Sequence, residues 1–456
     1  MSSVASDRAF LGTALHAPVR GKLEALSDVL IVAGADGAIK AIHRSESPEH
    51  EKQTQHFASR GNLLSLGPDQ YLLPGMVDLH VHAPQWPQLG KALDLPLEEW
   101  LQAYTFPLEA RYADTVYAKA VYESLVEGLL ANGTTTALYF GTIHLPATQI
   151  LADICLRKAQ RALIGRVAMD DRQQCPDYYR DASPDSALDL TRSFIEYVRS
   201  MPGNRTSLIQ PVITPRFIPS CSDELLAGLG RLARETGCHV QTHCSESDWE
   251  HGFVLERCGK TDTAALDGFG LLCRRTILAH GNFVTDADIS LIRERGAGIA
   301  HCPLSNIYFS DAVFPLRKIL EHGVHLGLGS DIAGGASPSI LQNARQAVMA
   351  SRSLESGVDP ALSRAERRRP GARIDALTAF WLATAGGGLA LDLPIGVFKE
   401  GFQFDAMLID ARVAGSDLRV ETVDTPEEVL QKIIYLASRL NIRRVWVANR
   451  QVYGQG

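Results

Sequence analysis

Residues 74–82 read PGMVDLHVH, an apolar run that is interrupted by Asp78 and ends in two histidines. The run 76–81 has the character of a buried strand. In a strand, residues i and i+2 point to the same face, so the imidazoles of His80 and His82 converge on one point. This is the spacing of two metal ligands, and it predicts a polar site at the carboxyl end of the strand.

Seven further apolar runs alternate with longer amphipathic stretches such as 223–236 (DELLAGLGRLARET). Continuous apolar strands separated by helices indicate a parallel sheet that is covered on both faces, and eight such units match a (β/α)₈ barrel. We therefore expect a TIM-like barrel over residues 73–390. The expected strands are 76–81, 135–140, 163–169, 208–213, 239–242, 276–279, 297–300 and 324–328.

Both ends of the chain are rich in strand patterns. Residues 28–33 and 38–42 form a predicted hairpin, and 404–409, 444–448 and 452–453 are expected strands near the other end. Sheets need cover for their edges and apolar faces, so we expect the two ends to pair into one small β-sandwich domain. Its two parts would be residues 1–72 and 391–456.

The composition is that of a soluble enzyme. The 456 residues include 45 Lys and Arg against 52 Asp and Glu, a net charge of −7, so nucleic acid is not an expected partner. The eight cysteines show no CxxC pairing, which favours reduced thiols in the cytoplasm. We find no secretory signal and no apolar run of about 18 residues, the length that a membrane span needs.

Three more candidate ligands end later apolar runs: His243, His280 and Asp331. The strand ends of a barrel share one mouth, so these side chains and the first two histidines are expected in one pocket. Imidazoles with a carboxylate suit Zn²⁺ or Fe²⁺, and a position left open for water makes such a site catalytic. The donor set does not separate the two metals.

Nearly the whole chain resembles the amidohydrolase superfamily. Residues 74–82 resemble its PGxVDxHxH opening, and His243, His280 and Asp331 match its later ligand positions. Residues 396–406 (GVFKEGFQFDA) resemble its GxxxxGxxAD return to the β-domain, with Phe-Asp-Ala where Ala-Asp is commoner. The resemblance implies one cation per chain, with zinc first and iron second, held by His80, His82, His243 and Asp331.

The resemblance also indicates a subgroup. Two-metal members carry a carboxylated lysine on the fourth strand, whereas no lysine lies between Lys158 and Lys260 here, which favours the one-metal subgroup of deaminases. Glu246 resembles the HxxE proton shuttle of that subgroup. The implied catalytic residues are Glu246, which protonates a ring nitrogen, Asp331, which takes a proton from water, and His280, which stabilises the attacking oxygen. Whether His280 also touches the metal stays open.

Several segments, from the first histidines to residue 335, resemble the guanine deaminases, which implies guanine and water as substrates. Arg216 would donate to the carbonyl group of the base, and Gln85 would read an edge that offers both a donor and an acceptor. Phe217 would stack on the ring, Trp86 would wall the pocket, and His243 would border the base. The matching segments are 82–86 (HAPQW), 94–101 (DLPLEEWL), 104–109 (YTFPLE), 132–136 (NGTTT), 214–217 (TPRF), 300–303 (AHCP) and 329–335 (GSDIAGG).

Two alternatives remain at this level. A sister hydrolase with the same metal centre would act on another aminopurine, an aminopyrimidine or a triazine. A non-catalytic scaffold on the same barrel would usually have lost metal ligands, and here all four are present. A homodimer is the default expectation for an enzyme of this size.

Overall fold

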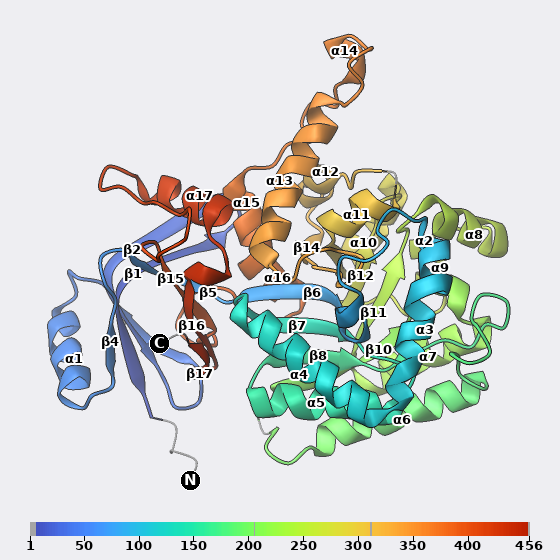
Figure 1. The fold of residues 1–456 in the computed structure, drawn as a ribbon, viewed down its shortest axis with the longest axis horizontal. Coiled ribbons are helices and arrows are strands. Elements are labelled where there is room, and N and C mark those ends of the chain that lie inside the picture. The colour runs from blue at the N-terminus through green and yellow to red at the C-terminus, as the bar shows by residue number, and fades with distance from the viewer. Residues whose placement is uncertain (1–5, 205, 311, 455–456) are drawn as a thin grey trace.

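The computed structural model describes residues 6–204, 206–310 and 312–454 (Figure 1). Its larger sheet runs in the order β14-β13-β12-β11-β10-β8-β7-β6, with β9 beside β10, and every pairing in it is parallel. These strands are β6 (Met76–His82), β7 (Thr134–Phe140), β8 (Arg161–Gly165), β9 (Val167–Ala168), β10 (Ile209–Pro215), β11 (His239–Cys244), β12 (Thr276–His280), β13 (Gly298–His301) and β14 (His325–Leu328).

Backbone hydrogen bonds join the two ends of this sheet. The N–H of Asp331 donates to the carbonyl of His80 at 2.8 Å, and the N–H of His82 donates to the carbonyl of Ile332 at 3.0 Å. The segment after β14 is thereby fastened to β6, which completes the barrel. The expected (β/α)₈ architecture is confirmed.

One expected strand is divided. Residues 163–169 were expected as a single strand, whereas β8 ends at Gly165 and β9 begins at Val167. Arg166 lies between them, fully buried, and its guanidinium pairs with Asp181 and donates to the carbonyl of Ile143. A buried charge needs these partners. β8 and β9 pair with β10 in one register, Ile164 opposite Pro211 and Val167 opposite Thr214, so the strand is interrupted at Arg166 and then continues.

Helices lie around the barrel in Figure 1. The segment 223–236 is helical as expected: Ser222 caps α7 (Asp223–Thr236), its hydroxyl accepting from the N–H of Leu225, and Gly237 ends the helix in the left-handed region. The other helices from β6 to the end of the barrel are α2 (Leu97–Trp100), α3 (Phe106–Ala110), α4 (Thr115–Ala131), α5 (Leu145–Lys158), α6 (Pro184–Ser200), α8 (Asp248–Cys258), α9 (Asp262–Gly268), α10 (Asp286–Arg295), α11 (Pro303–Phe309), α12 (Leu316–Glu321), α13 (Ile340–Ser356), α14 (Arg364–Arg367), α15 (Ala376–Trp381) and α16 (Gly387–Ala390).

Both chain ends build the second sheet, in the order β17-β16-β15-β5-β1-β2-β3 with β4 beside β1. The expected pairing of the two ends is confirmed by β15, which runs antiparallel to β5 from Ala406 opposite Pro74 to Asp410 opposite Gln70. The strands are β1 (Arg8–Val19), β2 (Lys22–Ala33), β3 (Ile39–His43), β4 (Leu63–Ser65), β5 (Gln70–Pro74), β15 (Ala406–Asp410), β16 (Ile442–Val447) and β17 (Arg450–Gly454), with helices α1 (Pro48–Ser59) and α17 (Pro426–Leu436).

An aromatic cluster fills the interior of this terminal sheet. The ring of Phe10 on β1 lies 4.3 Å from that of Phe404 and 5.2 Å from that of Trp446 on β16, measured between centroids. All three side chains are buried. The two ends therefore share one small core, as a sandwich does. The limits 1–72, 73–390 and 391–456 stay a prediction.

Among the described residues, no helix combines the length and the apolar character that crossing a membrane requires.

Candidate metal centre and pocket

The barrel brings the five expected metal-competent side chains together at the carboxyl ends of its strands. His80 and His82 lie on β6, His243 on β11, His280 at the end of β12, and Asp331 follows β14. All five are buried. His280 and Asp331 adopt positive φ angles of 73° and 49°, a region that costs energy for residues other than glycine and that clusters at functional sites.

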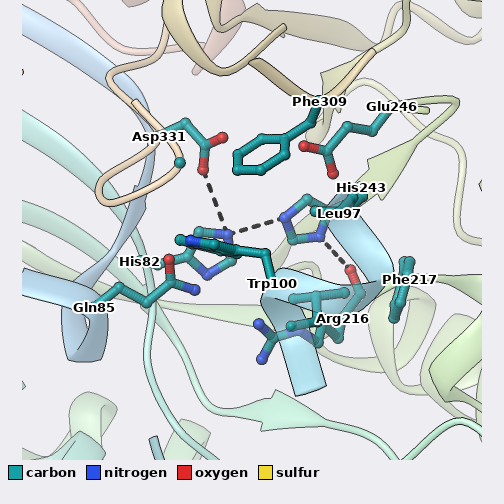
Figure 2. A pocket seen from close by; sticks show the side chains of 12 residues that line it. His82, Gln85, Leu97, Trp100, Arg216, Phe217, His243, Glu246, Phe309 and Asp331 are labelled. Carbon is teal, nitrogen blue, oxygen red and sulfur yellow. Dashed lines mark hydrogen bonds and ion pairs between the residues drawn. The ribbon is translucent and has the colours of Figure 1, made fainter. Parts of the chain in front are cut away.

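Short distances link four of these side chains: His80, His82, His243 and Asp331. Asp331 Oδ1 lies 3.1 Å from His80 Nε2 and 3.6 Å from His82 Nε2. His82 Nε2 lies 2.9 Å from His243 Nε2, and Figure 2 shows both rings and the carboxylate of Asp331 facing one point. Ligand atoms of His80, His82 and His243 all lie within 4.8 Å of one another, as metal ligands must.

His280 lies next to this group. Its Nε2 is 4.0 Å from Asp331 Oδ2 and 3.5 Å from Glu246 Oε1. It also forms a potential ligand group with His80, Asp331 and Cys302, within the same 4.8 Å. Cys302 was not singled out as a site residue. The segment 300–303 was the only signal for it, and burial raises the pKa of its thiol well above the ordinary value.

Hydrogen bonds fix two of the imidazole rings. His243 Nδ1 lies 2.6 Å from the carbonyl oxygen of Arg216, which can only accept, so Nδ1 carries the proton and Nε2 faces the centre with a lone pair. His280 Nδ1 lies 2.9 Å from Asn306 Oδ1, and this contact likewise directs His280 Nε2 toward the centre with a lone pair. Such outer contacts orient histidines that bind metals.

The electrostatics suit a cation. Burial lowers the pKa of His80 and His280, and lowers that of His82 and His243 well below the ordinary value, so the rings are neutral and able to ligate. Burial alone would raise the pKa of the Asp331 carboxyl, but the surrounding histidines outweigh it and hold that pKa well below its usual range. Among the described residues, no hydrogen-bond partner is found for the buried Nε2 atoms of His80 and His280. Neutral imidazoles with one carboxylate fit Zn²⁺ or Fe²⁺.

Asp78 connects the two segments that carry His80 and Asp331. Its buried Oδ1 accepts from the N–H of Ser330 at 2.9 Å and from the N–H of His80 at 3.2 Å. Burial raises its pKa to about 6. The contacts tie β6 to the segment that carries Asp331, so the two sources of ligands keep a fixed separation.

A pocket opens beside the centre (Figure 2). Its polar wall includes five of the residues expected to work on the substrate, and its apolar wall is mostly aromatic. The polar wall consists of His82, Gln85, Arg216, His243, Glu246 and Asp331, and the apolar wall of Leu97, Trp100, Leu101, Phe217 and Phe309, with Gly334 at one side.

The expectation that Trp86 forms a wall of the pocket is wrong. Its indole does not line this pocket; it lies near Gly128 on α4, and its Nε1 donates to Ser124 Oγ at 3.1 Å. Trp100, at the end of α2, lines the pocket instead, and it was not among the expected site residues. Gln85 and Trp86 are consecutive residues of the 3-10 helix Ala83–Gln88, in which successive side chains point in different directions, so Gln85 faces the pocket and Trp86 faces α4.

Hydrogen bonds of its main-chain groups to neighbouring side chains fix the position of Glu246. Its N–H donates to Glu250 Oε2 at 2.7 Å, and its carbonyl accepts from Asn282 Nδ2 at 2.8 Å and from Ser310 Oγ at 2.6 Å. Burial, to which the charge of Asp331 adds, raises the pKa of the Glu246 carboxyl well above its ordinary value. A raised pKa favours the protonated form of a carboxyl, the form that can serve as a general acid.

The sequence also matches a known family. Residues 71–452 match the model of the amidohydrolase family. The chain belongs to the amidohydrolase family. This amidohydrolase is 37% identical to a probable guanine deaminase of Schizosaccharomyces pombe, and the match covers 98% of this chain and 83% of that protein. It is 37% identical to the guanine deaminase of Dictyostelium discoideum, with 97% of each chain covered.

A solved structure agrees with these relatives. The guanine deaminase of C. acetobutylicum, with guanine bound in its active site, superposes on this amidohydrolase with a TM-score of 0.86 at 30% identity, covering 98% of this chain and all of the other.

Proposed function

We propose that this amidohydrolase converts guanine and water into xanthine and ammonia. One observation carries the proposal: the carboxyl of Glu246, whose pKa burial raises, and the histidine and aspartate cluster border the same pocket as Arg216 and Gln85. An acid, a site for a cation and groups that read a flat polar base are what hydrolytic deamination requires. Relatives named guanine deaminase and a related structure with bound guanine support it.

The proposed cofactor is one Zn²⁺ per chain, with Fe²⁺ as the second candidate because it accepts the same donors. His80, His82, His243 and Asp331 would hold it. A cation bound there would lower the pKa of a coordinated water toward roughly 7.

The pocket residues orient the base. The Arg216 guanidinium donates to the carbonyl oxygen of guanine, and the Gln85 amide meets the neighbouring polar edge. Phe217 and Trp100 offer ring faces to the purine, and the apolar wall excludes water. The amine-bearing carbon then faces His243 and Asp331.

Proton transfers complete the reaction. Asp331 accepts a proton from the attacking water, and Glu246 gives its proton to the ring nitrogen beside the amine-bearing carbon. His280 stabilises the attacking oxygen. A carbon–oxygen bond forms, the carbon–nitrogen bond breaks, and the amino group leaves as ammonia once it has received a proton from Asp331. The remaining proton on the attacking oxygen passes to Glu246, so the new carbonyl forms and the acid is restored.

The setting of the reaction is part of the proposal. We place the chain in the cytoplasm, in purine breakdown, as a homodimer. The eight free cysteines support a reducing compartment, and six of them are buried: Cys155, Cys175, Cys221, Cys238, Cys244 and Cys302.

The test is loss of guanine absorbance with one ammonia released per base, measured before and after chelation. A panel of other aminopurines, aminopyrimidines and triazines is assayed in parallel. Faster ammonia release from one of those compounds than from guanine would replace guanine as the substrate, and full activity of a metal-free protein would remove the proposed cofactor.

A further inference from the structure

Glu109 lies behind the pocket, on α3, and does not line it. Its side chain is completely buried. Its carboxylate accepts from Arg216 Nη1 at 2.7 Å and Nη2 at 3.2 Å, and from Gln85 Nε2 at 2.9 Å. The hydroxyl of Tyr179 adds a further donor at 2.8 Å. One carboxylate thus holds both polar residues that face the base.

These contacts determine which way the Gln85 amide points. Its Nε2 donates to Glu109, an acceptor, and its Oε1 accepts from the N–H of Ala333 at 3.0 Å, a donor. A flipped amide would place oxygen against carboxylate and NH₂ against N–H, losing two buried hydrogen bonds. Gln85 therefore offers a ligand one N–H and one lone pair in fixed places.

Arg216 is constrained by the same group. Two of its nitrogens are used by the bidentate pair with Glu109, and its guanidinium lies 5.1 Å from the centre of the Phe106 ring. The planar fork is thereby held in one orientation, and its remaining N–H groups can only donate. A base that placed an amino group against them would leave donors facing donors.

We propose that Glu109 is the positioning residue that sets the donor and acceptor order recognised by this pocket. The proposal rests on the proposed function, because it assumes a base in the pocket. The recognised edge carries a carbonyl oxygen beside a ring N–H, as in guanine. The rejected edge carries an amino group beside a bare ring nitrogen.

Hypoxanthine and adenine test this order directly. Both lack the amino group at the carbon where guanine carries it, and they are nearly the same size. Hypoxanthine has the carbonyl and the ring N–H, whereas adenine has the amino group and the bare nitrogen. Equilibrium binding of the two bases to the metal-loaded protein is measured by calorimetry, so the result does not depend on turnover.

The main variant is Glu109→Gln, which keeps the shape of the side chain but adds a donor and allows the Gln85 amide to flip. We expect the wild-type protein to bind hypoxanthine at least ~10-fold more tightly than adenine, and the variant to lose most of that ratio. Glu109→Asp keeps an acceptor but retracts it, so its ratio should fall between the two.

Asp181→Asn is the matched control. Asp181 forms a buried pair with Arg166 that resembles the pair of Glu109 and Arg216 but does not border the pocket. It should lower stability and leave the ratio unchanged. A wild-type protein without a preference, or both Glu109 variants with the wild-type ratio, would overturn the proposal. If the wild type prefers hypoxanthine and the Glu109 variants lose that preference, but no ammonia is released from guanine, only the proposed function is overturned.

Discussion

Asp331 and His80 are joined twice, by the backbone hydrogen bond of 2.8 Å between the Asp331 N–H and the His80 carbonyl and by the 3.1 Å approach of Asp331 Oδ1 to His80 Nε2. The two residues whose backbones join the ends of the barrel therefore also bring two of the expected metal ligands together. Asp331→Asn keeps the backbone bond and removes the charge. We expect it to lose bound metal and at least ~10²-fold in kcat while the fold is retained.

Metal content per chain, circular dichroism and kcat check this prediction. Asp189→Asn, an exposed change on α6, is the control and should match the wild type. Normal metal content with normal turnover in Asp331→Asn would contradict the assignment of this carboxylate.

Glu246→Gln removes the acid but preserves the size of the side chain and its backbone contacts to Glu250, Asn282 and Ser310. We expect kcat to fall ~10²–10⁴-fold, because a carboxamide cannot deliver the proton. Metal content should stay at the wild-type level. A variant that keeps its metal and near-normal turnover would exclude the shuttle role.

Removal of the metal should lower stability as well as activity. The cation binds the folded centre, so at a free concentration of 100 times its Kd it contributes about 2.7 kcal/mol to the free energy of unfolding. Chelated protein should therefore unfold at a lower temperature, and added Zn²⁺ should restore both the midpoint and the turnover. Equal melting curves with and without metal would argue against a centre built on His80, His82, His243 and Asp331.

His251 makes stability depend on pH. Its Nδ1 lies 3.0 Å from Asp262 Oδ2, and the hydrogen bond to Asp262 raises the pKa of its ring, with Asp288 and Asp248 adding to the effect. A raised pKa means that this contribution is fully present below the ordinary value of 6.5 and is lost as pH rises through the folded-state pKa.

The difference in unfolding midpoint between the wild type and His251→Gln should therefore be larger at pH 6 than at pH 8.5. The comparison with the variant removes the opposite contribution of the buried histidines, whose lowered pKa values weaken the fold as pH falls. A difference that grows with pH would show the sign to be wrong.

Asp405 links the barrel to the terminal sheet. Its carboxylate pairs with Arg161 at the start of β8, at 3.1 and 3.2 Å, and also accepts from the N–H of Ala448. Both members of the pair are buried. Asp405→Ala leaves Arg161 uncompensated, so we expect a loss of about 3–5 kcal/mol in the free energy of unfolding. Urea titration measures it, and the double variant with Arg161→Met should recover part of the loss.

The barrel was predictable because its strands carry a strong local signal. Expected strands such as 239–242 and 276–279 correspond to β11 and β12, and the polar residues at their ends are His243 and His280. The long hairpin of β1 and β2 was only partly anticipated. Its burial comes in blocks and not in strict alternation, and the strands include polar side chains, so the pattern in 8–19 is weak until the partner strand is known.

The site was predictable where the chemistry lies at strand ends and not where it depends on packing. Glu109 and Trp100 lie on short helices after β6, and nothing in their neighbours along the chain indicates that they meet Arg216 or border the pocket. Trp86 shows the reverse: a tryptophan near the ligands along the chain turns toward Ser124. Sequence proximity does not determine direction in irregular segments.

The position of β5 between β1 and β15 has a consequence for synthesis of the chain. β15 follows the barrel, so a ribosome releases β5 long before its neighbour exists. Throughout translation of the barrel, one edge of the nascent sheet exposes unpaired amide and carbonyl groups, which are a template for intermolecular association. Slow elongation or premature termination before β15 therefore favours aggregation of the nascent polypeptide.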